Sequence, residues 1–285
     1  MKVPFQVDLK GKVAVVTGGG GVLCSTFASA LAKCGARVAI LDLKEEAAEA
    51  VAERIRADGG EAMAVQADVL SRESLEQARD RIEEALGSCD ILVNGAGGNH
   101  PRGTTSGEYL YEEDLAGGDS ELKTFFDLDR DGVSFVFNLN FMGTLLSSQV
   151  FARHMLKKKH CVIINVSSMN AFTPLTRIPA YSAAKAAVSN FTQWLAVHLS
   201  KVGIRVNAIA PGFFLTDQNR SLLLNEDGSY TPRAEKIMGQ TPMERFGVPE
   251  DLVGTLLWLV DEGASGFVNG TVIPVDGGFS AYSGV

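Results

Sequence analysis

The sequence lacks most features of secreted, membrane-spanning and metal-binding proteins. Its four cysteines, Cys24, Cys34, Cys89 and Cys161, are scattered singly and never form C-x-x-C spacing. Isolated cysteines favour reduced thiols over disulfides or a zinc site. No apolar run approaches the ~18 residues of a membrane span, and the start MKVPFQVDLKGK carries charges where a signal peptide would be apolar. We therefore expect a cytoplasmic protein that does not cross a membrane.

Positive charge is also scarce. The chain has 26 Lys and Arg against 34 Asp and Glu, a formal net charge of -8, which argues against a nucleic-acid-binding surface. The segment DLDRDG at 127–132 imitates the start of a calcium loop, but its twelfth position is Asn138 where that loop needs a glutamate. We expect one of these aspartates to cap the helix that follows. His154, His160 and His198 have no zinc-ligand spacing, so no metal is expected.

The sequence does contain a regular alternation of strand and helix. Nearly continuous apolar runs indicate strands covered on both faces, and stretches such as 44–58 and 71–86 carry apolar residues at helical spacing. This alternation predicts right-handed crossovers and a parallel sheet. No repeat or linker divides the chain. We expect one α/β domain over 1–285, a Rossmann-type doubly wound sheet of about seven strands at 13–17, 37–42, 62–67, 90–94, 161–166, 204–209 and 271–275.

Two stretches interrupt the alternation. Residues 98–131 are rich in glycine, threonine, serine and acids, and residues 212–245 form a second irregular segment. Both follow predicted strands, and ligands of open α/β sheets bind beyond the carboxyl ends of the strands. We therefore expect an insertion loop and a substrate loop that overhang the same crevice. Loops of this length inside a compact domain are usually functional or disordered.

A dinucleotide site is predicted near the first strand. TGGGGVLC at 17–24 joins that strand to a helix, and such a turn presents N–H groups and the positive end of the helix to phosphate. Asp42 ends the second strand, where a carboxylate accepts hydrogen bonds from both adenosine ribose hydroxyls and repels a 2′-phosphate. This favours NAD over NADP, although Lys44 weakens the preference. Asp68 follows the third strand, where it would accept from the adenine amino group, and the small residues at 94–97 permit close approach of the ribose.

A proton-transfer device is predicted further along the chain. Tyr181 and Lys185 stand four residues apart in PAYSAAKAAV, and Ser168 lies thirteen residues before Tyr181. Residues at i and i+4 share one face of a helix, so the phenol and the ammonium should lie side by side. A neighbouring positive charge favours the phenolate, so a tyrosine with an ordinary pKa near ~10 can exchange protons near neutral pH. A serine hydroxyl opposite them would hold the reacting oxygen.

Taken together, these motifs resemble the short-chain dehydrogenase/reductase family, in its single-domain branch. The likeness runs from Leu9 to Ser280. Any one of its parts occurs by chance, whereas the ordered combination is specific. Its parts are the glycine turn, NGAG at 94–97, Asn140 in NFMG, Ser168, Tyr181 and Lys185, Pro211-Gly212 with Thr216, and Asp276-Gly-Gly.

The resemblance implies a role for each matched residue. Tyr181 would be the general acid/base, with Lys185 lowering its pKa and binding the nicotinamide ribose. Ser168 would polarise the reacting carbonyl, and Asn140 would hold a water that relays protons to solvent. The backbone of Phe214 would meet the nicotinamide carboxamide. With NAD(H) as the cofactor, the implied binding residues are Gly18, Gly21, Val22, Leu23, Asp42, Asp68, Val69, Asn94, Ala96, Gly97, Tyr181, Lys185, Pro211, Gly212, Phe214 and Thr216.

The glycine turn departs from the family pattern T-G-x-x-x-G-x-G. Aligned from Thr17 without a gap, the second and third glycines of the pattern fall on Val22 and Cys24. Four consecutive glycines, Gly18 to Gly21, stand there instead. The pyrophosphate would then approach along an altered backbone path, with Gly21 relieving the crowding.

The substrate prediction depends on the insertion. The span from Asn94 to Asn140 exceeds what is typical of this branch, and GGNHP together with TGGGGVLC resembles the subgroup of D-mannonate oxidoreductases, also called fructuronate reductases. A sugar acid needs a cation, and arginine binds carboxylates in bidentate fashion, so Arg102 and Arg177 are the preferred pair. Other polyol or sugar-acid dehydrogenases, of the gluconate or 2-deoxygluconate type, remain alternatives. The candidate substrate residues are His100, Arg102, Asn170 and Arg177, with Lys123 as a further cation.

Two hypotheses from other classes stay open. A dinucleotide-binding regulator without turnover predicts a damaged Ser–Tyr–Lys–Asn set, and all four residues are present. A hydrolase or aldolase on the same fold lacks a G-x-S-x-G nucleophile elbow here and leaves Asp42 without a purpose. The resemblance also implies a homotetramer built through the helices that contain Asn140 and Tyr181. The apolar faces of those helices are compatible with this, and a plain core explains them equally well.

Overall fold

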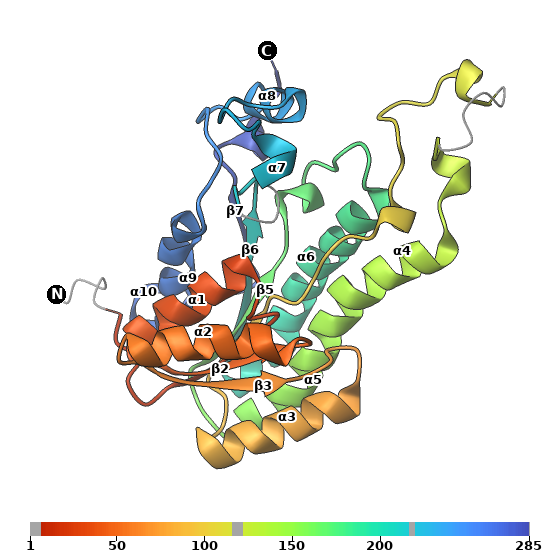
Figure 1. Cartoon of the computed structure of the whole chain (residues 1–285). Coiled ribbons are helices and arrows are strands. Elements are labelled where there is room, and N and C mark those ends of the chain that lie inside the picture. Colours follow the sequence, from red (N-terminus) through yellow and green to blue (C-terminus); the bar gives the residue numbers. More distant parts are fainter. Residues whose placement is uncertain (1–6, 116–121, 217–219, 285) are drawn as a thin grey trace.

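The computed structural model describes residues 7–115, 122–216 and 220–284. These contain a seven-stranded sheet in the order β3-β2-β1-β4-β5-β6-β7, with every neighbouring pair parallel (Figure 1). The predicted doubly wound sheet is thereby confirmed, with strand ends displaced by one or two residues at most. The strands are β1 (Val13–Thr17), β2 (Arg37–Asp42), β3 (Glu61–Gln66), β4 (Ile91–Asn94), β5 (Cys161–Val166), β6 (Ile204–Pro211) and β7 (Val272–Val275).

A hydrophobic core lies on each face of the sheet. Ala14 and Val16 of β1 pack in the cluster with α1, α2 and α9, whereas Val13 and Val15 pack in the cluster with α3, α5 and α6. Burial on both faces explains why the strand sequences are nearly continuous in apolar residues. The helices of these layers are α1 (Val22–Lys33), α2 (Glu45–Ala57), α3 (Arg72–Ala85), α5 (Gly143–Met155), α6 (Pro179–Leu199), α9 (Val253–Val260) and the short α10 (Glu262–Ser265).

The strand order reverses between β1 and β4. β2 and β3 follow on one side of β1, and β5, β6 and β7 follow on the other side of β4. At such a reversal the connections leave in opposite directions, and the carboxyl ends of the two central strands open a crevice. Thr17 and Asn94 are register partners at these ends. The topology therefore brings the glycine turn beside residues 94–97.

The described residues of the insertion 98–131 project from the body as an extended arm (Figure 1). It leads into α4 (Arg130–Phe137), which Asp129 caps by accepting a hydrogen bond from the Gly132 N–H at 2.6 Å. The expected aspartate cap is confirmed, and the described residues contain no cluster of metal-ligating side chains. The regular structure in the described part of the arm is limited to 3₁₀ turns at Pro101–Gly103, Glu112–Leu115 and Phe125–Asp127.

The loop 212–245 is less irregular than predicted. It contains α7 (Arg220–Leu223) and α8 (Pro232–Met238). Thr231 caps α8 by accepting from the Ala234 N–H, and Pro232 occupies its first turn. These are local helix-start signals, but α8 is too short to show the periodicity on which the prediction depended. Within the described ranges, no helix is long and apolar enough to cross a membrane.

Candidate active site

Close backbone contacts shape the glycine turn after β1. Gly18 has φ +63, and a Cβ there would lie 2.8 Å from the Ala96 Cα. A Cβ on Gly20 would lie 2.7 Å from the Ala47 Cβ. Side chains at these positions would push the turn away from β2, β4 and α2, so glycine is needed for the turn to sit this deep.

The end of the turn becomes the start of α1. Gly21 is the N-cap, no side chain caps it, and the helix begins with Val22 and Leu23. The first N–H groups of α1 are therefore available to an anion in the crevice. A Cβ on Gly21 would meet only the Gly18 carbonyl, at 3.2 Å, whereas one on Gly19 would lie 2.6 Å from Ile40. Contacts within the protein thus require glycine at positions 19 and 20, whereas the relief of pyrophosphate crowding by Gly21 stays a prediction.

Asp42 is fixed at the end of β2. Its Oδ2 accepts a hydrogen bond from the Gly20 N–H at 3.0 Å, and its Oδ1 accepts one from the Lys44 N–H at 3.1 Å. Each carboxylate oxygen has a further lone pair, so both can still accept from hydroxyls of a ribose. The Asp68 carboxylate after β3 accepts from the Leu70 N–H at 2.8 Å and is exposed. Val69 beside it is buried.

The side chain of Asn94 does not line the crevice. It is 2% exposed, and its Nδ2 donates to Ser148 Oγ at 2.9 Å and to Asn165 Oδ1 at 2.8 Å. Asn165 in turn donates to Thr192 Oγ1 at 2.9 Å. These bonds tie β4 to β5, α5 and α6. The Asn94 side chain is therefore not free to contact a cofactor, and of the predicted cofactor residues after β4 Gly97 lies close to Asn140 and Lys185.

Asn140 lies under the loop that follows β4. It is fully buried in a π-helical turn, Asn138–Met142, between α4 and α5, a feature common at functional sites. Its Oδ1 accepts from the Gly98 N–H at 3.2 Å, and its Nδ2 donates to the Gly98 carbonyl at 2.7 Å. A Cβ on Gly97 would lie 2.6 Å from Asn140 Oδ1 and 3.2 Å from Lys185 Nζ. Gly97 thus lies close to both predicted catalytic side chains.

Ser168, Tyr181 and Lys185 come together as predicted. Ser168 Oγ accepts from the Asn170 N–H at 3.3 Å, and its hydroxyl lies close enough to the Tyr181 phenol to lower the pKa of Tyr181. Lys185 Nζ lies 5.6 Å from the centre of the Tyr181 ring and donates to the Val166 carbonyl at 2.8 Å. The i, i+4 spacing on α6 places the phenol and the ammonium on one helix face, opposite the serine from the end of β5.

Burial dominates the electrostatics of this group. It raises the pKa of Tyr181 above the ordinary value, while the hydrogen bond with Ser168 acts in the opposite direction. Burial also lowers the pKa of Lys185 from 10.5 to about 8. In this structure burial is the largest influence on the pKa of Tyr181, and the lowering of that pKa by Lys185 that the resemblance implies stays a prediction.

The turn after β6 packs against the segment that follows β7. A Cβ on Gly212 would lie 2.6 Å from the Asp276 Cα, so the two backbones touch. The Asp276 carboxylate accepts from the N–H groups of Gly278 and Ser280, both at 2.9 Å. Pro211 is buried as the last residue of β6, and Thr216 ends the described part of this turn.

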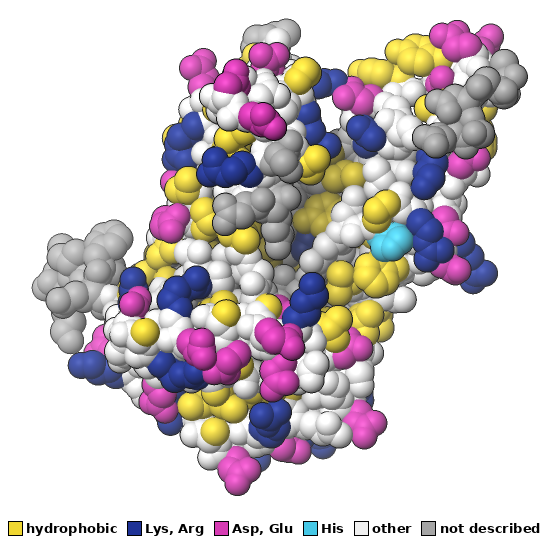
Figure 2. All heavy atoms as spheres, viewed as in Figure 1, with side chains coloured by type: hydrophobic (Ala, Val, Ile, Leu, Met, Phe, Trp, Pro, Cys, Tyr) yellow, Lys and Arg dark blue, Asp and Glu magenta, His cyan; other side chains and the backbone are white. Residues whose placement is uncertain are grey.

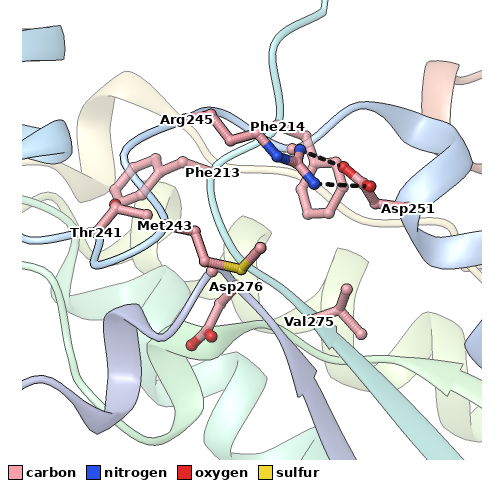
Figure 3. A pocket seen from close by; sticks show the side chains of 10 residues that line it. Phe213, Phe214, Thr241, Met243, Arg245, Asp251, Val275 and Asp276 are labelled. Carbon is pink, nitrogen blue, oxygen red and sulfur yellow. Dashed lines mark hydrogen bonds and ion pairs between the residues drawn. The ribbon is translucent and has the colours of Figure 1, made fainter.

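A pocket of ≈ 220 Å³ lies beside this turn (Figure 3). The rings of Phe213 and Phe214 line it, together with Met243. At its edge Arg245 makes hydrogen bonds of 2.7 and 3.0 Å to the two carboxylate oxygens of Asp251. The guanidinium is therefore already paired, and this pocket offers an apolar wall behind the predicted nicotinamide position.

The predicted substrate residues lie in the flanking loops and are partly engaged. Arg102 Nη1 forms an ion pair with Asp129 at 3.3 Å. Arg177 Nε donates to the Thr105 carbonyl at 3.1 Å, which leaves its two terminal amino groups without a partner among the described residues. The Oδ1 of Asn170 is buried without a hydrogen bond, and the residue is 4% exposed.

His100 and Lys123 also have local roles. His100 Nδ1 accepts from the Arg102 N–H at 3.2 Å, and its ring lies 5.2 Å from that of Phe135. The Lys123 N–H donates to Ser106 Oγ at 2.9 Å within the arm. These contacts order the insertion itself.

The arm and the substrate loop meet across the mouth of the site. Figure 2 shows a hollow between the lobe of α7 and α8 and the insertion arm. Lys236 of α8 and Glu108 of the arm form an ion pair that joins the two. This contact brings the two segments together at one point, and that both overhang one crevice stays a prediction; an exposed ion pair adds little stability.

The model of the short chain dehydrogenase family matches residues 12–227, a span that includes every catalytic residue described above. The chain belongs to the short-chain dehydrogenase family. It is 56% identical over 283 residues to the uncharacterized oxidoreductase UxuB of Bacillus subtilis, covering 99% of this chain and 100% of that protein.

Two further relatives of this short-chain dehydrogenase carry more specific names. A crystal structure of a Haemophilus influenzae protein provisionally named a D-mannonate oxidoreductase, with bound NAD, has a TM-score of 0.93 and 57% identity, covering 98% of each chain. The 5-keto-D-gluconate 5-reductase of Escherichia coli is 32% identical over 273 residues, which is 95% of this chain and 96% of that protein. The chain is therefore an oxidoreductase, and its relatives act on more than one substrate.

Sequence reasoning missed two residues that order the site of this short-chain dehydrogenase. Thr17 served only as the first position of the glycine pattern, yet its Oγ1 accepts from the Gly95 N–H at 3.1 Å and the Ala96 N–H at 3.3 Å. Gly95 itself faces Cys24. The role of Thr17 could have been inferred from the sequence, because a hydroxyl at the end of a buried strand can bond the neighbouring loop. The role of Gly95 could not, because it depends on Cys24, which lies far away in the sequence.

Proposed function

We propose that this short-chain dehydrogenase uses NAD(H) to interconvert a secondary alcohol and a ketone on a sugar acid, with D-mannonate/D-fructuronate as the leading candidate. The observation that carries the reaction type is the grouping of Ser168, Tyr181 and Lys185, in which Lys185 Nζ lies 5.6 Å from the centre of the phenol ring and the Ser168 hydroxyl lowers the pKa of Tyr181. The substrate class is supported by the likeness to the Haemophilus influenzae protein at 57% identity.

The chain's own residues fit a nicotinamide dinucleotide. Gly18 and Gly20 let the turn lie close against Ala96 and Ala47, and the turn ends at the start of α1, where the first N–H groups of the helix have no side-chain cap. Asp42 would accept from the adenosine ribose, and Lys185 would reach the nicotinamide ribose. The dinucleotide, when bound, supplies the hydride acceptor or donor, and the protein supplies alignment and a proton path.

The proton path follows from the geometry. In oxidation, Tyr181 Oη would take the proton of the substrate hydroxyl while Ser168 Oγ hydrogen-bonds the same oxygen. Lys185 would stabilise the phenolate. Asn140, which Gly97 brings close to Lys185, would hold a water that passes the proton on towards solvent. In reduction the same groups would act in reverse.

Asp42→Asn is expected to weaken discrimination against NADPH. The change removes the charge that would repel a 2′-phosphate and keeps an oxygen for the Gly20 N–H. We expect the ratio of the Kd values for NADPH and NADH to fall about tenfold, which corresponds to ~1.4 kcal/mol. Fluorescence titration with both cofactors measures this, with the exposed Asp58→Asn as a matched control. An unchanged ratio would show that another residue selects the cofactor.

Arg177→Ala is expected to raise the KM for a sugar acid about tenfold with little change in kcat, because the lost contact forms in the ground state and in the transition state alike. Arg102→Ala should change KM less than about threefold, since Asp129 already neutralises Arg102. Steady-state kinetics decide this, with a neutral polyol as the control substrate. If neither change alters KM for the sugar acid, the proposed carboxylate contact is wrong.

The substrate test is a panel of aldonates, keto-uronates, polyols and hydroxysteroids followed by NADH fluorescence. Turnover of mannonate or fructuronate supports the leading candidate. Turnover of gluconate derivatives alone would favour the second candidate, a gluconate- or 2-deoxygluconate-type enzyme, which the 32% identity to the 5-keto-D-gluconate 5-reductase supports. NADH binding without any turnover would favour a regulator.

We also propose that the protein is a homotetramer assembled through α4, α5 and α6. Phe135, Trp194 and Val197 on these helices are 42%, 57% and 76% exposed, so a core within one chain does not account for them. Sedimentation of the full chain measures the assembly, and a monomer would contradict it.

A further inference from the structure

Cys24 stands where the family pattern has its third glycine, and a glycine stands opposite it. A Cβ added to Gly95 would lie 2.1 Å from Cys24 Sγ and 2.9 Å from the Thr17 carbonyl. Real atoms do not approach so closely, so the thiol occupies the space that any side chain at position 95 would take.

The loop that contains Gly95 is held at both ends. Thr17 Oγ1 accepts from the N–H groups of Gly95 and Ala96, and Asn140 bonds both backbone groups of Gly98. Between these anchors, Gly97 lies close to Lys185 and Asn140. Because hydrogen bonds hold the loop at both ends, a displacement of Gly95 would also displace the backbone of Gly97, which lies beside Lys185 and Asn140.

The thiol of Cys24 fills space in the protein interior and is not placed to react. Cys24 is 5% exposed, and burial raises its pKa to about 12, with Lys185 acting in the opposite direction. The thiol is therefore protonated and uncharged at neutral pH, and solvent reaches little of it. Its remaining contribution is the volume of one sulfur atom between α1 and the loop.

We propose that Cys24 and Gly95 form a matched steric pair that positions loop 95–98 against the glycine turn, and that Gly95 is thereby a positioning residue for the dinucleotide. The inference rests on the proposed use of NAD(H) and needs no particular substrate. It also gives the departure from the glycine pattern a physical reason: the sulfur of Cys24 is tolerated because the residue that faces it is a glycine.

Four variants test the pair: Gly95→Ala, Cys24→Ala, the double variant, and Gly254→Ala as a control. An added Cβ at Gly254 meets nothing within 4 Å. We expect Gly95→Ala to raise the Kd for NADH about 10- to 100-fold, because overpacking shifts the loop. Cys24→Ala alone should change it less than about fivefold, because the loop keeps both anchors.

The double variant tests whether Cys24 Sγ causes the loss of NADH affinity in Gly95→Ala. With Sγ removed, the nearest atom of residue 24 is its Cβ at 3.5 Å, an ordinary contact, while the Thr17 carbonyl at 2.9 Å still crowds the new methyl. We therefore expect the double variant to bind NADH at least about fivefold more tightly than Gly95→Ala, without reaching the wild-type affinity. KM for NAD should follow the same order, with kcat changing less.

The outcomes separate the hypotheses. Wild-type NADH affinity in Gly95→Ala, or no recovery in the double variant, would overturn the matched pair. If Gly95→Ala does not fold, a folded double variant that binds NADH supports the pair, and an unfolded one overturns it. If wild-type protein and Gly254→Ala fail to bind NADH, the proposed cofactor is wrong, which distinguishes that failure from failure of the pair.

Discussion

Replacing Tyr181 by phenylalanine is expected to lower kcat about 10³-fold or more while the Kd for NADH changes less than about threefold. The change removes one oxygen from a half-buried ring and leaves α6 and the Lys185 contact with the Val166 carbonyl intact. The loss therefore falls on proton transfer. Stopped-flow or steady-state turnover of a substrate from the panel measures kcat, and fluorescence titration measures binding.

A matched variant and a pH profile sharpen this test. Tyr111→Phe removes the same oxygen from a ring that is 57% exposed on the arm and should be neutral. Because the hydrogen bond with Ser168 lowers the pKa of Tyr181, Ser168→Ala should move the pH at which oxidation half-develops to a higher value, besides lowering kcat. Tyr181→Phe activity above a tenth of wild type would assign the proton transfer to another group.

Lys185→Met is expected to abolish most activity and yet stabilise the protein without cofactor. Activity should fall about 10²- to 10³-fold, since phenolate stabilisation and the ribose contact disappear together. The pKa of Lys185 is about 8 in the fold against an ordinary 10.5, so the unfolded chain binds this proton more tightly. The charged lysine thus opposes folding at pH 7, by about 3 kcal/mol at most.

The stability effect of Lys185→Met has a defined pH dependence. Removing the charge stabilises, while losing the hydrogen bond to Val166 costs about 1 kcal/mol, so we expect a net gain of about 2 kcal/mol in the free energy of unfolding at pH 7. Since the folded-state pKa is depressed, the penalty in wild type disappears as the pH rises from about 8 to 10.5, and the gain should vanish over that range.

Chemical denaturation at pH 7 and pH 10 measures this difference. Lys201→Met, at the exposed end of α6, is the matched control and should change stability by less than about 0.5 kcal/mol at both pH values. A Lys185→Met protein that is less stable than wild type at pH 7 would show that the ammonium is better solvated in the crevice than its burial implies.

The stability gain expected for Lys185→Met bears on why the site contains several buried polar side chains. Asn140, Ser168 and Lys185 are 0%, 7% and 4% exposed, so the site gathers polar groups where apolar ones would pack at lower cost. Such sites are retained for chemistry at the expense of stability. The same reasoning applies to the unpaired Oδ1 of Asn170, which a substrate hydroxyl or a small local rearrangement would satisfy.

Most of the fold was predictable because its signals are local and repeated. Strands such as Val13–Thr17 are continuous apolar runs, and helices such as Arg72–Ala85 carry their periodicity over several turns. The two short helices of the substrate loop were missed because four and seven residues carry too little pattern. The arm was identified as an insertion, but its direction and its contact with Lys236 were not, because both depend on residues over a hundred positions away.

Some properties of the site could likewise be predicted from the sequence, and others could not. The sequence by itself determined which groups would meet: the i, i+4 spacing on a helix and the order of strand ends place Ser168, Tyr181 and Lys185 together in any doubly wound sheet. Only the tertiary structure decided their ionisation, since burial raises the pKa of Tyr181 and lowers that of Lys185, and desolvation depends on every surrounding atom.

The contacts between side chains from distant segments were also determined only by the tertiary structure. The sequence shows that Cys24 replaces a glycine, but not that Gly95 receives its sulfur, because the two lie on different elements that the sheet brings together. The sequence also shows the charge of Arg102, but not the Asp129 partner that neutralises it. The sequence alone determines which residue types are present and how they are spaced. The burial of ionisable groups, the pairing of charges and the packing of side chains depend on contacts between distant segments, which exist only once the sheet has formed.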